Sequence, residues 1–222
     1  LFLVLIAMLV SFSATPQVTA DFTTNTATTG CGSLVVEFED LSTGSPTSWL
    51  WDFGNGNTSN LQNPVAIYST AGVYDVELKV LDGVTNDLKT VLSFIKVYNE
   101  PTADLQANSL TAGCIPLIVD FNDNSSSISP IATWQWDFGD GGSSNSQTPS
   151  YNFENDGIFS VSLSVVDING CQSLATEIDF VNVNKVPLTD FESDIKFSCN
   201  ASELVSFTNN TINASSFIWD FG

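Results

Sequence analysis

The sequence predicts an all-β protein built from tandem β-sandwich domains, and three observations lead to this prediction. The motif Trp-Asp-Phe-Gly occurs at Trp51–Gly54, Trp136–Gly139 and Trp219–Gly222, so the copies begin 85 and 83 residues apart. Apolar and polar residues alternate with a period of two in several short runs, which is typical of strands with one buried face. Gly, Pro, Asn and Ser separate these runs, and no stretch has convincing helical spacing, which favours a β-sandwich.

The clearest strands follow the first two copies of the motif. The alternating apolar positions are Tyr74, Val76, Leu78 and Val80 in the first case, and Phe159, Val161, Leu163 and Val165 in the second. Polar residues occupy the positions between them, so each run is expected to lie in an antiparallel sheet with one face in water. We expect further strands at residues 34–38, 94–98 and 117–121.

The repeat extends beyond the motif and sets the expected domain boundaries. Residues 20–42 resemble residues 103–125, a third version starts at Thr189, and a proline opens each unit at Pro16, Pro101 and Pro187. A repeat of about 85 residues is long enough to fold as an independent domain, unlike the shorter units of solenoids. We therefore expect domains at residues 16–100, 101–186 and 187–222, of which the last holds only the N-terminal part of a sandwich.

The first residues predict export. Residues 1–15 contain an apolar run of roughly a dozen residues, which suits the core of a signal peptide and is too short for a membrane span. We expect a partial signal peptide, cut after Ser13 or Ala20, and favour Ser13 because that cut keeps the proline lead-in at Pro16. A buried N-terminal strand is the alternative. The prediction is a secreted or cell-surface protein.

The composition excludes many kinds of chemistry. The chain has no His, and 5 Lys or Arg against 25 Asp or Glu give a formal net charge of −20. Catalytic triads and ordinary zinc sites that contain His are therefore excluded. Asp-Phe-Gly is not a kinase motif here, because the His-Arg-Asp loop and the strand Lys that accompany it in kinases are missing. The acidic surface would repel nucleic acid and anionic lipid. We expect no enzyme activity, no cofactor and no membrane insertion of the mature domains.

The Trp-Asp-Phe-Gly motif is predicted to be a signature of the fold. Its alternate aromatic residues share a strand face that we expect to be core, and the glycines that follow supply turn conformations. The aspartate is expected to accept hydrogen bonds from turn amides. The signature residues are Trp51, Asp52, Phe53 and Gly54; Trp136, Asp137, Phe138 and Gly139; and Trp219, Asp220, Phe221 and Gly222.

These repeats resemble the PKD (polycystic kidney disease) domain. The resemblance rests on WDFGNG and WDFGDG, each followed by Asn-Pro or Thr-Pro, an aromatic residue, and the strand AGVYDVELKVLDG or DGIFSVSLSVVDING. It covers residues 16–222, and the cysteine-bearing variant is similar to repeats in secreted proteins of Bacteroidota-type bacteria. Asn55 and Phe159 depart from the family pattern, which puts in doubt any role of a carboxylate at position 55.

The resemblance implies an immunoglobulin-like sandwich of extracellular proteins, with no catalytic activity of its own. It implies a spacer or adhesion module whose partner is an extracellular polysaccharide or protein. The alternative is that the domains are accessories of a secreted polysaccharidase or protease whose catalytic domain lies beyond residue 222. A calcium-dependent adhesin is a third alternative.

Four cysteines lie far apart, at Cys31, Cys114, Cys171 and Cys199. Three of them hold the same place in the repeat, and only the second unit has another, Cys171. We therefore predict a Cys114–Cys171 disulfide formed in an oxidising compartment. Cys199 would find its partner in the rest of its own unit, and Cys31 would be a buried thiol or an intermolecular bridge.

Two further binding sites stay open as weaker alternatives. Trp49 and Trp134 could stack on sugars, although core packing is the leading role for both. Acidic residues near loops could hold calcium, although the spacing of known calcium loops is absent. These residues are Asp82, Asp87, Asp123, Asp137 and Asp140.

Overall fold

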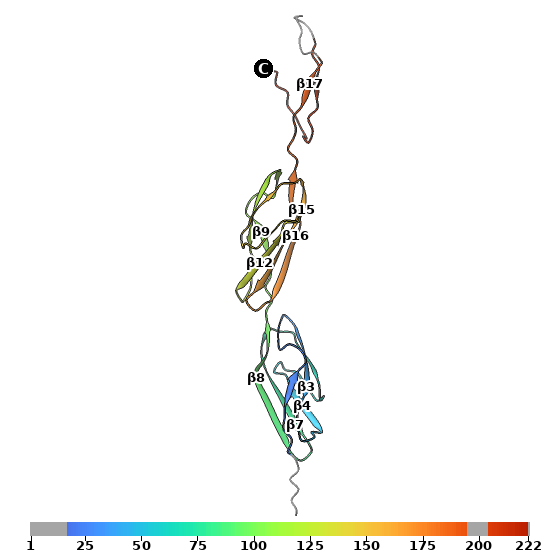
Figure 1. The fold of residues 1–222 in the computed structure, drawn as a ribbon, viewed down its shortest axis with the longest axis vertical. Coiled ribbons are helices and arrows are strands. Elements are labelled where there is room, and N and C mark those ends of the chain that lie inside the picture. The colour runs from blue at the N-terminus through green and yellow to red at the C-terminus, as the bar shows by residue number, and fades with distance from the viewer. Residues whose placement is uncertain (1–16, 195–203, 222) are drawn as a thin grey trace, which may run out of the picture. The chain divides into compact units, whose positions relative to one another are not determined.

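The structure, a computed structural model, describes residues 17–194 and 204–221 as strands, turns and loops (Figure 1). No helix occurs among these residues, which confirms the predicted all-β class, and none that could span a membrane is found there. The chain divides into two compact units, Leu1–Glu100 and Pro101–Gly222, and each is described by itself. The expected signal peptide at residues 1–15 lies outside the described residues, as does Cys199.

The first unit is a sandwich of two sheets. One sheet has the strand order β1-β3-β6 and the other has the order β2-β8-β7-β4-β5. Strands β2 and β8 run parallel, and the other neighbours are antiparallel. The strands are β1 (Phe22–Thr24), β2 (Thr29–Cys31), β3 (Leu34–Asp40), β4 (Ser48–Asp52), β5 (Thr58–Ser59), β6 (Val65–Tyr68), β7 (Gly72–Leu81) and β8 (Asn86–Tyr98).

The second unit repeats this plan up to Asn184. Its two sheets have the orders β14-β11-β9 and β10-β16-β15-β12-β13, again with one parallel pair, β10 and β16. The strands are β9 (Leu105–Ala107), β10 (Ala112–Cys114), β11 (Leu117–Asp123), β12 (Ile131–Asp137), β13 (Ser143–Ser144), β14 (Ser150–Phe153), β15 (Gly157–Asp167) and β16 (Gln172–Asn184).

The period-two pattern places the core between the two sheets of each sandwich. In β7 the side chains of Val76, Leu78 and Val80 are fully buried, and Trp51 of β4 is buried against them. The matching positions of the second core are Trp136, Val161, Leu163 and Val165. A single aromatic ring of this kind buries on the order of 150–250 Å², so the tryptophans dominate both small cores.

The third copy of the motif does not lie in a strand. Strand β17 (Phe191–Ser193) pairs with β18 (Phe207–Asn209) as β1 pairs with β3, but residues 217–221 form no strand. In the complete sandwiches, β4 and β12 pair with β7 and β15, which follow the motif in sequence. A strand needs such a neighbour for its backbone hydrogen bonds, and residues 217–221 have none among the described residues.

Candidate functional site

The Trp-Asp-Phe-Gly motif ends β4 and β12 in a tight turn. Asp52 Oδ1 accepts a hydrogen bond from the backbone N–H of Gly54 at 2.9 Å, and Asp137 Oδ1 accepts one from Gly139 at 2.9 Å. The two glycines have φ angles of +72° and +81°, in the left-handed region. The carboxylate and the glycine therefore shape the turn together.

The motif tryptophans are anchored from inside their own sandwiches. The rings of Trp51 and Trp136 are completely buried. Their Nε1–H groups donate to the carbonyl oxygens of Leu61 and Ser146, each at 2.9 Å. A buried indole N–H without such an acceptor would be destabilising, so these carbonyl groups let a polar ring fill the core.

The other tryptophan of each strand is held by a carboxylate. In the first unit, Asp40 Oδ2 accepts hydrogen bonds from Trp49 Nε1 at 2.7 Å and from Gln62 Nε2 at 3.0 Å. Asp40 Oδ1 accepts a third from the backbone N–H of Ser42 at 3.0 Å. Trp49 is half-buried, and its ring is fixed by this contact as well as by packing.

The second unit has the same arrangement. Asp123 Oδ2 accepts hydrogen bonds from Trp134 Nε1 at 2.7 Å and from Gln147 Nε2 at 3.3 Å, and Asp123 Oδ1 accepts from the N–H of Ser125 at 2.9 Å. Trp134 and Asp123 were separate candidates for sugar binding and calcium binding. The structure joins them in one internal network.

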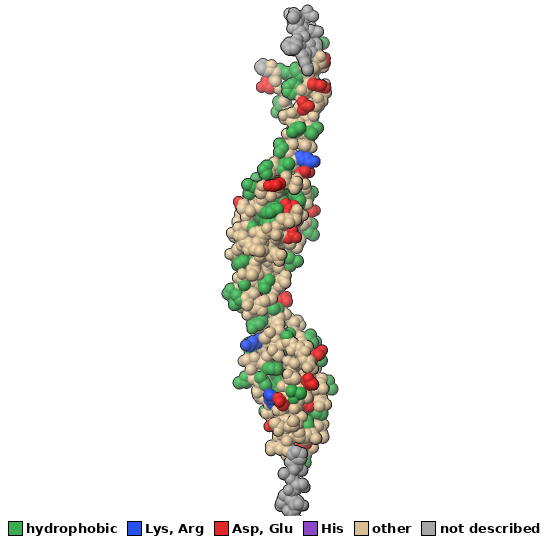
Figure 2. Space-filling model, in the orientation of Figure 1, with side chains coloured by type: hydrophobic (Ala, Val, Ile, Leu, Met, Phe, Trp, Pro, Cys, Tyr) green, Lys and Arg blue, Asp and Glu red, His purple; other side chains and the backbone are tan. Residues whose placement is uncertain are grey.

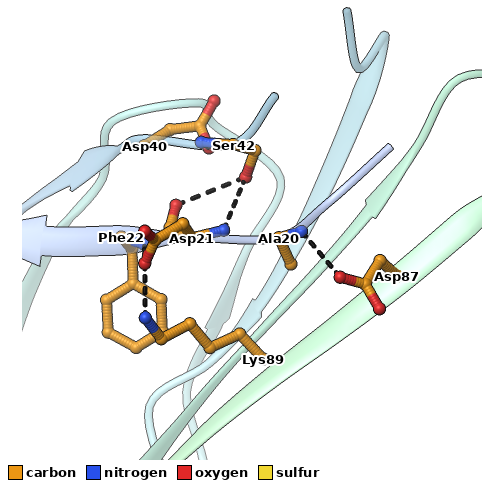
Figure 3. Close-up of polar contacts among 7 residues, drawn as sticks. All are labelled: Ala20, Asp21, Phe22, Asp40, Ser42, Asp87 and Lys89. Carbon is orange, nitrogen blue, oxygen red and sulfur yellow. Dashed lines mark hydrogen bonds and ion pairs between the residues drawn. The ribbon is translucent and has the colours of Figure 1, made fainter. Parts of the chain in front are cut away.

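A second polar cluster ties the N-terminal strand of the first unit to β8 (Figure 3). The Lys89 ammonium group pairs with the carboxylate of Asp21 and lies 5.5 Å from the centre of the Phe22 ring. Beside it, the backbone N–H of Ala20 donates to Asp87 Oδ2 at 2.8 Å. Lys89 and Asp21 are 68 residues apart, and no local feature of the sequence pointed to their contact.

Ser42 links the two clusters of the first unit. Its Oγ accepts a hydrogen bond from the Asp21 N–H at 3.1 Å and donates one to the Asp21 carbonyl oxygen at 3.3 Å (Figure 3). Its own backbone N–H donates to Asp40. The contacts run from Lys89 through Asp21 and Ser42 to Asp40 and Trp49, and they connect both sheets of one sandwich.

Hydrogen bonding lowers the pKa of three carboxyl groups in these clusters. Partial burial by itself raises the pKa of Asp40 and Asp123, but the donated hydrogen bonds outweigh burial, so each pKa lies below its ordinary value of 3.8. The pKa of Asp21 is also lowered, first by its hydrogen bond with Lys89 and then by the backbone N–H of Phe22. All three groups therefore favour the folded state when ionised.

We expect Asp40→Asn to destabilise the first unit by about 1–2 kcal/mol at pH 7, because it removes a charged acceptor of three hydrogen bonds. A carboxyl whose folded pKa is lowered stabilises the native state above its unfolded pKa and loses that contribution as the pH falls through the folded value. The difference between wild type and variant should therefore shrink below about pH 4. Urea unfolding at pH 7 and in steps below pH 4 measures it.

Glu37→Gln, a change at an exposed position of the same strand, is the matched control and should alter stability little at either pH. A loss of stability in Asp40→Asn that stays the same from pH 7 to pH 3 would contradict the lowered pKa of Asp40.

The acidic residues considered as calcium ligands are engaged in separate turns and contacts. Asp82 accepts hydrogen bonds from the N–H groups of Val84 and Thr85, and Asp87 accepts from Ala20. The others are held similarly: Asp123 by Ser125, Asp137 by Gly139, and Asp140 by Gly142 and Tyr151. Within the part of the chain that the structure describes, no group of three or more His, Cys, Asp and Glu is placed to hold a metal ion.

The predicted Cys114–Cys171 disulfide is wrong. Cys31 and Cys171 are each disulfide-bonded, whereas Cys114 is a free, exposed thiol. Cys114 is paired with Asn184, the last residue of β16, and Cys171 directly precedes Gln172, the first residue of β16. The length of that strand separates the two cysteines by roughly 40 Å, whereas a disulfide needs Cα atoms within about 7 Å.

Alkylation of the denatured but unreduced protein is expected to label Cys114 and to leave Cys31 and Cys171 unlabelled. Prior reduction should expose the thiols of these three residues, and peptide mapping by mass spectrometry assigns the label to each site and separates them from Cys199. Cys114→Ser is the control, because it should remove the label at position 114 without changing the protection of Cys31 and Cys171. Labelling of Cys171 before reduction would contradict the structure.

The large sheets carry two surface hollows that are lined by both polar and apolar side chains. Figure 2 shows acidic side chains scattered over the visible face among many uncharged groups. In the first unit a hollow of about 250 Å³ is lined by Leu50, Trp51, Asp52, Thr58, Glu77, Lys79 and Leu88. In the second unit a hollow of about 380 Å³ is lined by Ala132, Thr133, Trp134, Gln135 and Asn145.

Parts of this chain are similar in sequence to known proteins. The family profile described as the PKD domain matches residues 13–95 and 98–183. The pre-pro-metalloprotease PrtV of Vibrio cholerae serotype O1 is 31% identical over 135 residues, which make up 61% of this chain and 14% of that protein. The chain therefore spans a small part of this curated relative.

Two solved structures of single domains also match. The PKD1 domain of Vibrio anguillarum Epp is 26% identical with a TM-score of 0.34, over 39% of this chain and 98% of that chain. The PKD1 domain from the Vibrio cholerae metalloprotease PrtV is 26% identical with a TM-score of 0.33, over 37% and 98%. Because the two profile matches together cover more than half of its residues, the chain belongs to the PKD domain family.

Proposed function

We propose that these residues form a non-catalytic, extracellular run of PKD modules in a secreted or cell-surface protein, where they act as a spacer and present a contact surface to a glycan or a protein. The observation that carries the proposal is that all four tryptophan side chains of the two complete modules are engaged within their own module. Each Nε1–H group donates to an acceptor of its own module. The residues most suited to chemistry or binding instead hold the sandwich together.

The outer face of the five-stranded sheet in the first unit is the surface best suited to such a contact. Leu50 and Leu88 are exposed there, at 46% and 54%, on either side of Lys79. An apolar pair with one cation among polar neighbours can pack on a sugar face or a peptide. The net charge of −20 supports a neutral or cationic partner rather than a polyanion.

Retention of the chain on insoluble polysaccharides and on immobilised extracellular proteins tests the contact role. A Leu50→Ser, Leu88→Ser variant should lose retention. The matched control changes two exposed apolar residues of the three-stranded sheet instead, Val35→Ser and Ile67→Ser, and should keep it. Failure of the wild-type chain to bind any partner in the panel would refute the contact role and leave the spacer role alone.

The second candidate function is an accessory role in a secreted protease or polysaccharidase. The match to PrtV supports it, since that relative is named a metalloprotease and the matched region is a small part of its length. Sequencing the complete open reading frame tests this directly. A downstream domain with a recognisable catalytic constellation would support the accessory role, and further repeats that end in a surface anchor would exclude it.

A further inference from the structure

The sequence contains two Asn-Gly dipeptides, Asn55-Gly56 in the first unit and Asn169-Gly170 in the second. Asparagine is a chemically labile residue. It is most labile before glycine, because a residue without a side chain leaves its amide nitrogen free to approach the carbonyl carbon of the asparagine side chain. The local structure around each dipeptide determines whether this approach occurs.

The amide nitrogens of the two glycines have different hydrogen bonds. The backbone N–H of Gly170 donates to the carbonyl oxygen of Asp167 at 3.0 Å, which holds that nitrogen in its turn. The N–H of Gly56 has no acceptor among the described residues. Space does not distinguish the two glycines, because a Cβ added to either would meet nothing within 4 Å. The Gly56 nitrogen is therefore the freer nucleophile of the two.

The two asparagine side chains also differ. Oδ1 of Asn55 accepts a hydrogen bond from the backbone N–H of Asn57 at 3.0 Å. A donor at this oxygen stabilises the negative charge that develops on it when a nitrogen attacks the adjacent carbon. The carboxamide nitrogen of Asn169 donates to Ser129 Oγ at 2.7 Å, but its oxygen has no donor in the part of the chain that the structure describes.

We propose that Asn55 is a site of spontaneous deamidation in the folded protein, and that the fold protects Asn169 from the same reaction. The Gly56 nitrogen loses its proton to a solvent base and attacks Cγ of Asn55, the Cγ–Nδ2 bond breaks, and ammonia leaves. One molecule of water then opens the succinimide ring at either carbonyl carbon, which gives aspartate or isoaspartate at position 55. The reaction needs only water and a solvent base.

The conversion changes the edge of the three-stranded sheet. Nδ2 of Asn55 donates to the carbonyl oxygen of Ile67 in β6 at 3.0 Å, and β6 is an outer strand of its sheet. A carboxylate at position 55 cannot donate, so this contact is lost. In the second unit the corresponding carboxylate, Asp140, accepts a hydrogen bond from Tyr151 Oη at 2.9 Å, but Ala66 holds that place in the first unit. Deamidation is therefore expected to loosen β6.

The test follows the intact chain during incubation at mildly alkaline pH, with peptide mapping by mass spectrometry at intervals. Asn55 should deamidate about 10-fold faster than Asn169 in the folded chain, because one hydrogen bond to the attacking nitrogen corresponds to about that factor. In urea, where neither turn is formed, the two rates should be similar. Gly56→Ala is the control, since its Cβ hinders ring closure but meets nothing within 4 Å, and it should keep Asn55 unchanged.

Two outcomes would overturn the proposal. One is conversion of Asn169 in the folded chain as fast as that of Asn55. The other is a folded chain in which Asn55 does not convert although both residues convert in urea.

Asn55→Asp reproduces one product and measures the consequence for β6. Hydrogen exchange of the β6 amides should be about 5-fold faster in this variant than in the original chain. Asn60→Asp adds the same charge at an exposed position just after β5 and should leave the exchange unchanged. Equal exchange in the Asn55→Asp variant and the original chain would refute the loosening of β6.

Discussion

Gly54→Ala is expected to destabilise the first unit by about 3 kcal/mol or more, and Gly139→Ala should do the same to the second. Two effects add at each position. The backbone is in the left-handed region, which is unfavourable for residues that carry a Cβ atom. The new Cβ would also lie 2.4 Å from the carbonyl oxygen of Asp75 in the first unit, or 2.3 Å from that of Ser160 in the second. These oxygens are backbone atoms within β7 and β15, not the ends of flexible side chains that could move aside.

Urea unfolding followed by hydrogen exchange of the β7 and β15 amides reports each unit separately. The same turns contain matched controls, Gly56→Ala and Gly141→Ala. Both glycines have positive φ angles, +86° and +95°, but an added Cβ would meet nothing within 4 Å. The controls should therefore lose only about 1 kcal/mol. Equal losses at Gly54 and Gly56 would show that the close approach to β7 is unimportant.

Trp51→Ala is the second substitution with a large expected effect, a loss of about 4 kcal/mol in the stability of the first unit. The ring is completely buried, and its centroid lies 5.2 Å from that of Phe22 and 5.3 Å from that of Phe38. Its removal leaves a cavity that the paired strands on both sides prevent from closing. The loss is measured from urea unfolding of the first unit.

Trp49→Phe in the neighbouring position is the control. It keeps an aromatic ring at a half-buried site and removes one hydrogen bond to Asp40, so it should lose about 1–2 kcal/mol. A Trp49→Phe variant as unstable as Trp51→Ala would show that the indole–carboxylate contact, rather than core volume, governs the stability of the unit.

The third copy supports the coupling between that indole and that carboxylate. Phe217 takes the place of Trp49, and Asn209 takes the place of Asp40. Where the ring no longer has an N–H group to donate, the charged acceptor is also replaced. Asn209 keeps the local role, since its Oδ1 accepts a hydrogen bond from the N–H of Thr211 at 2.9 Å as Asp40 does from Ser42.

The all-β class, the tandem repeat and the buried faces of the main strands could all be predicted from the sequence alone. These features depend on local periodicity and on one motif. The periodicity can be recognised in the sequence because successive strand residues point to opposite faces. The buried set Val76, Leu78 and Val80 is an example. Glycines after an aromatic strand likewise indicate a turn without any knowledge of the rest of the fold.

The contacts between residues far apart in the sequence could not be predicted and are seen first in the structure. The ion pair joins Lys89 of β8 to Asp21, which directly precedes β1 of the other sheet, and no local pattern encodes it. The predicted Cys114–Cys171 bond was wrong because likeness between repeats does not reveal that the two residues lie at opposite ends of β16. Residues 217–221 form no strand in the described part of the chain, although the motif predicted one, because a strand depends on a hydrogen-bonding neighbour that no local pattern encodes.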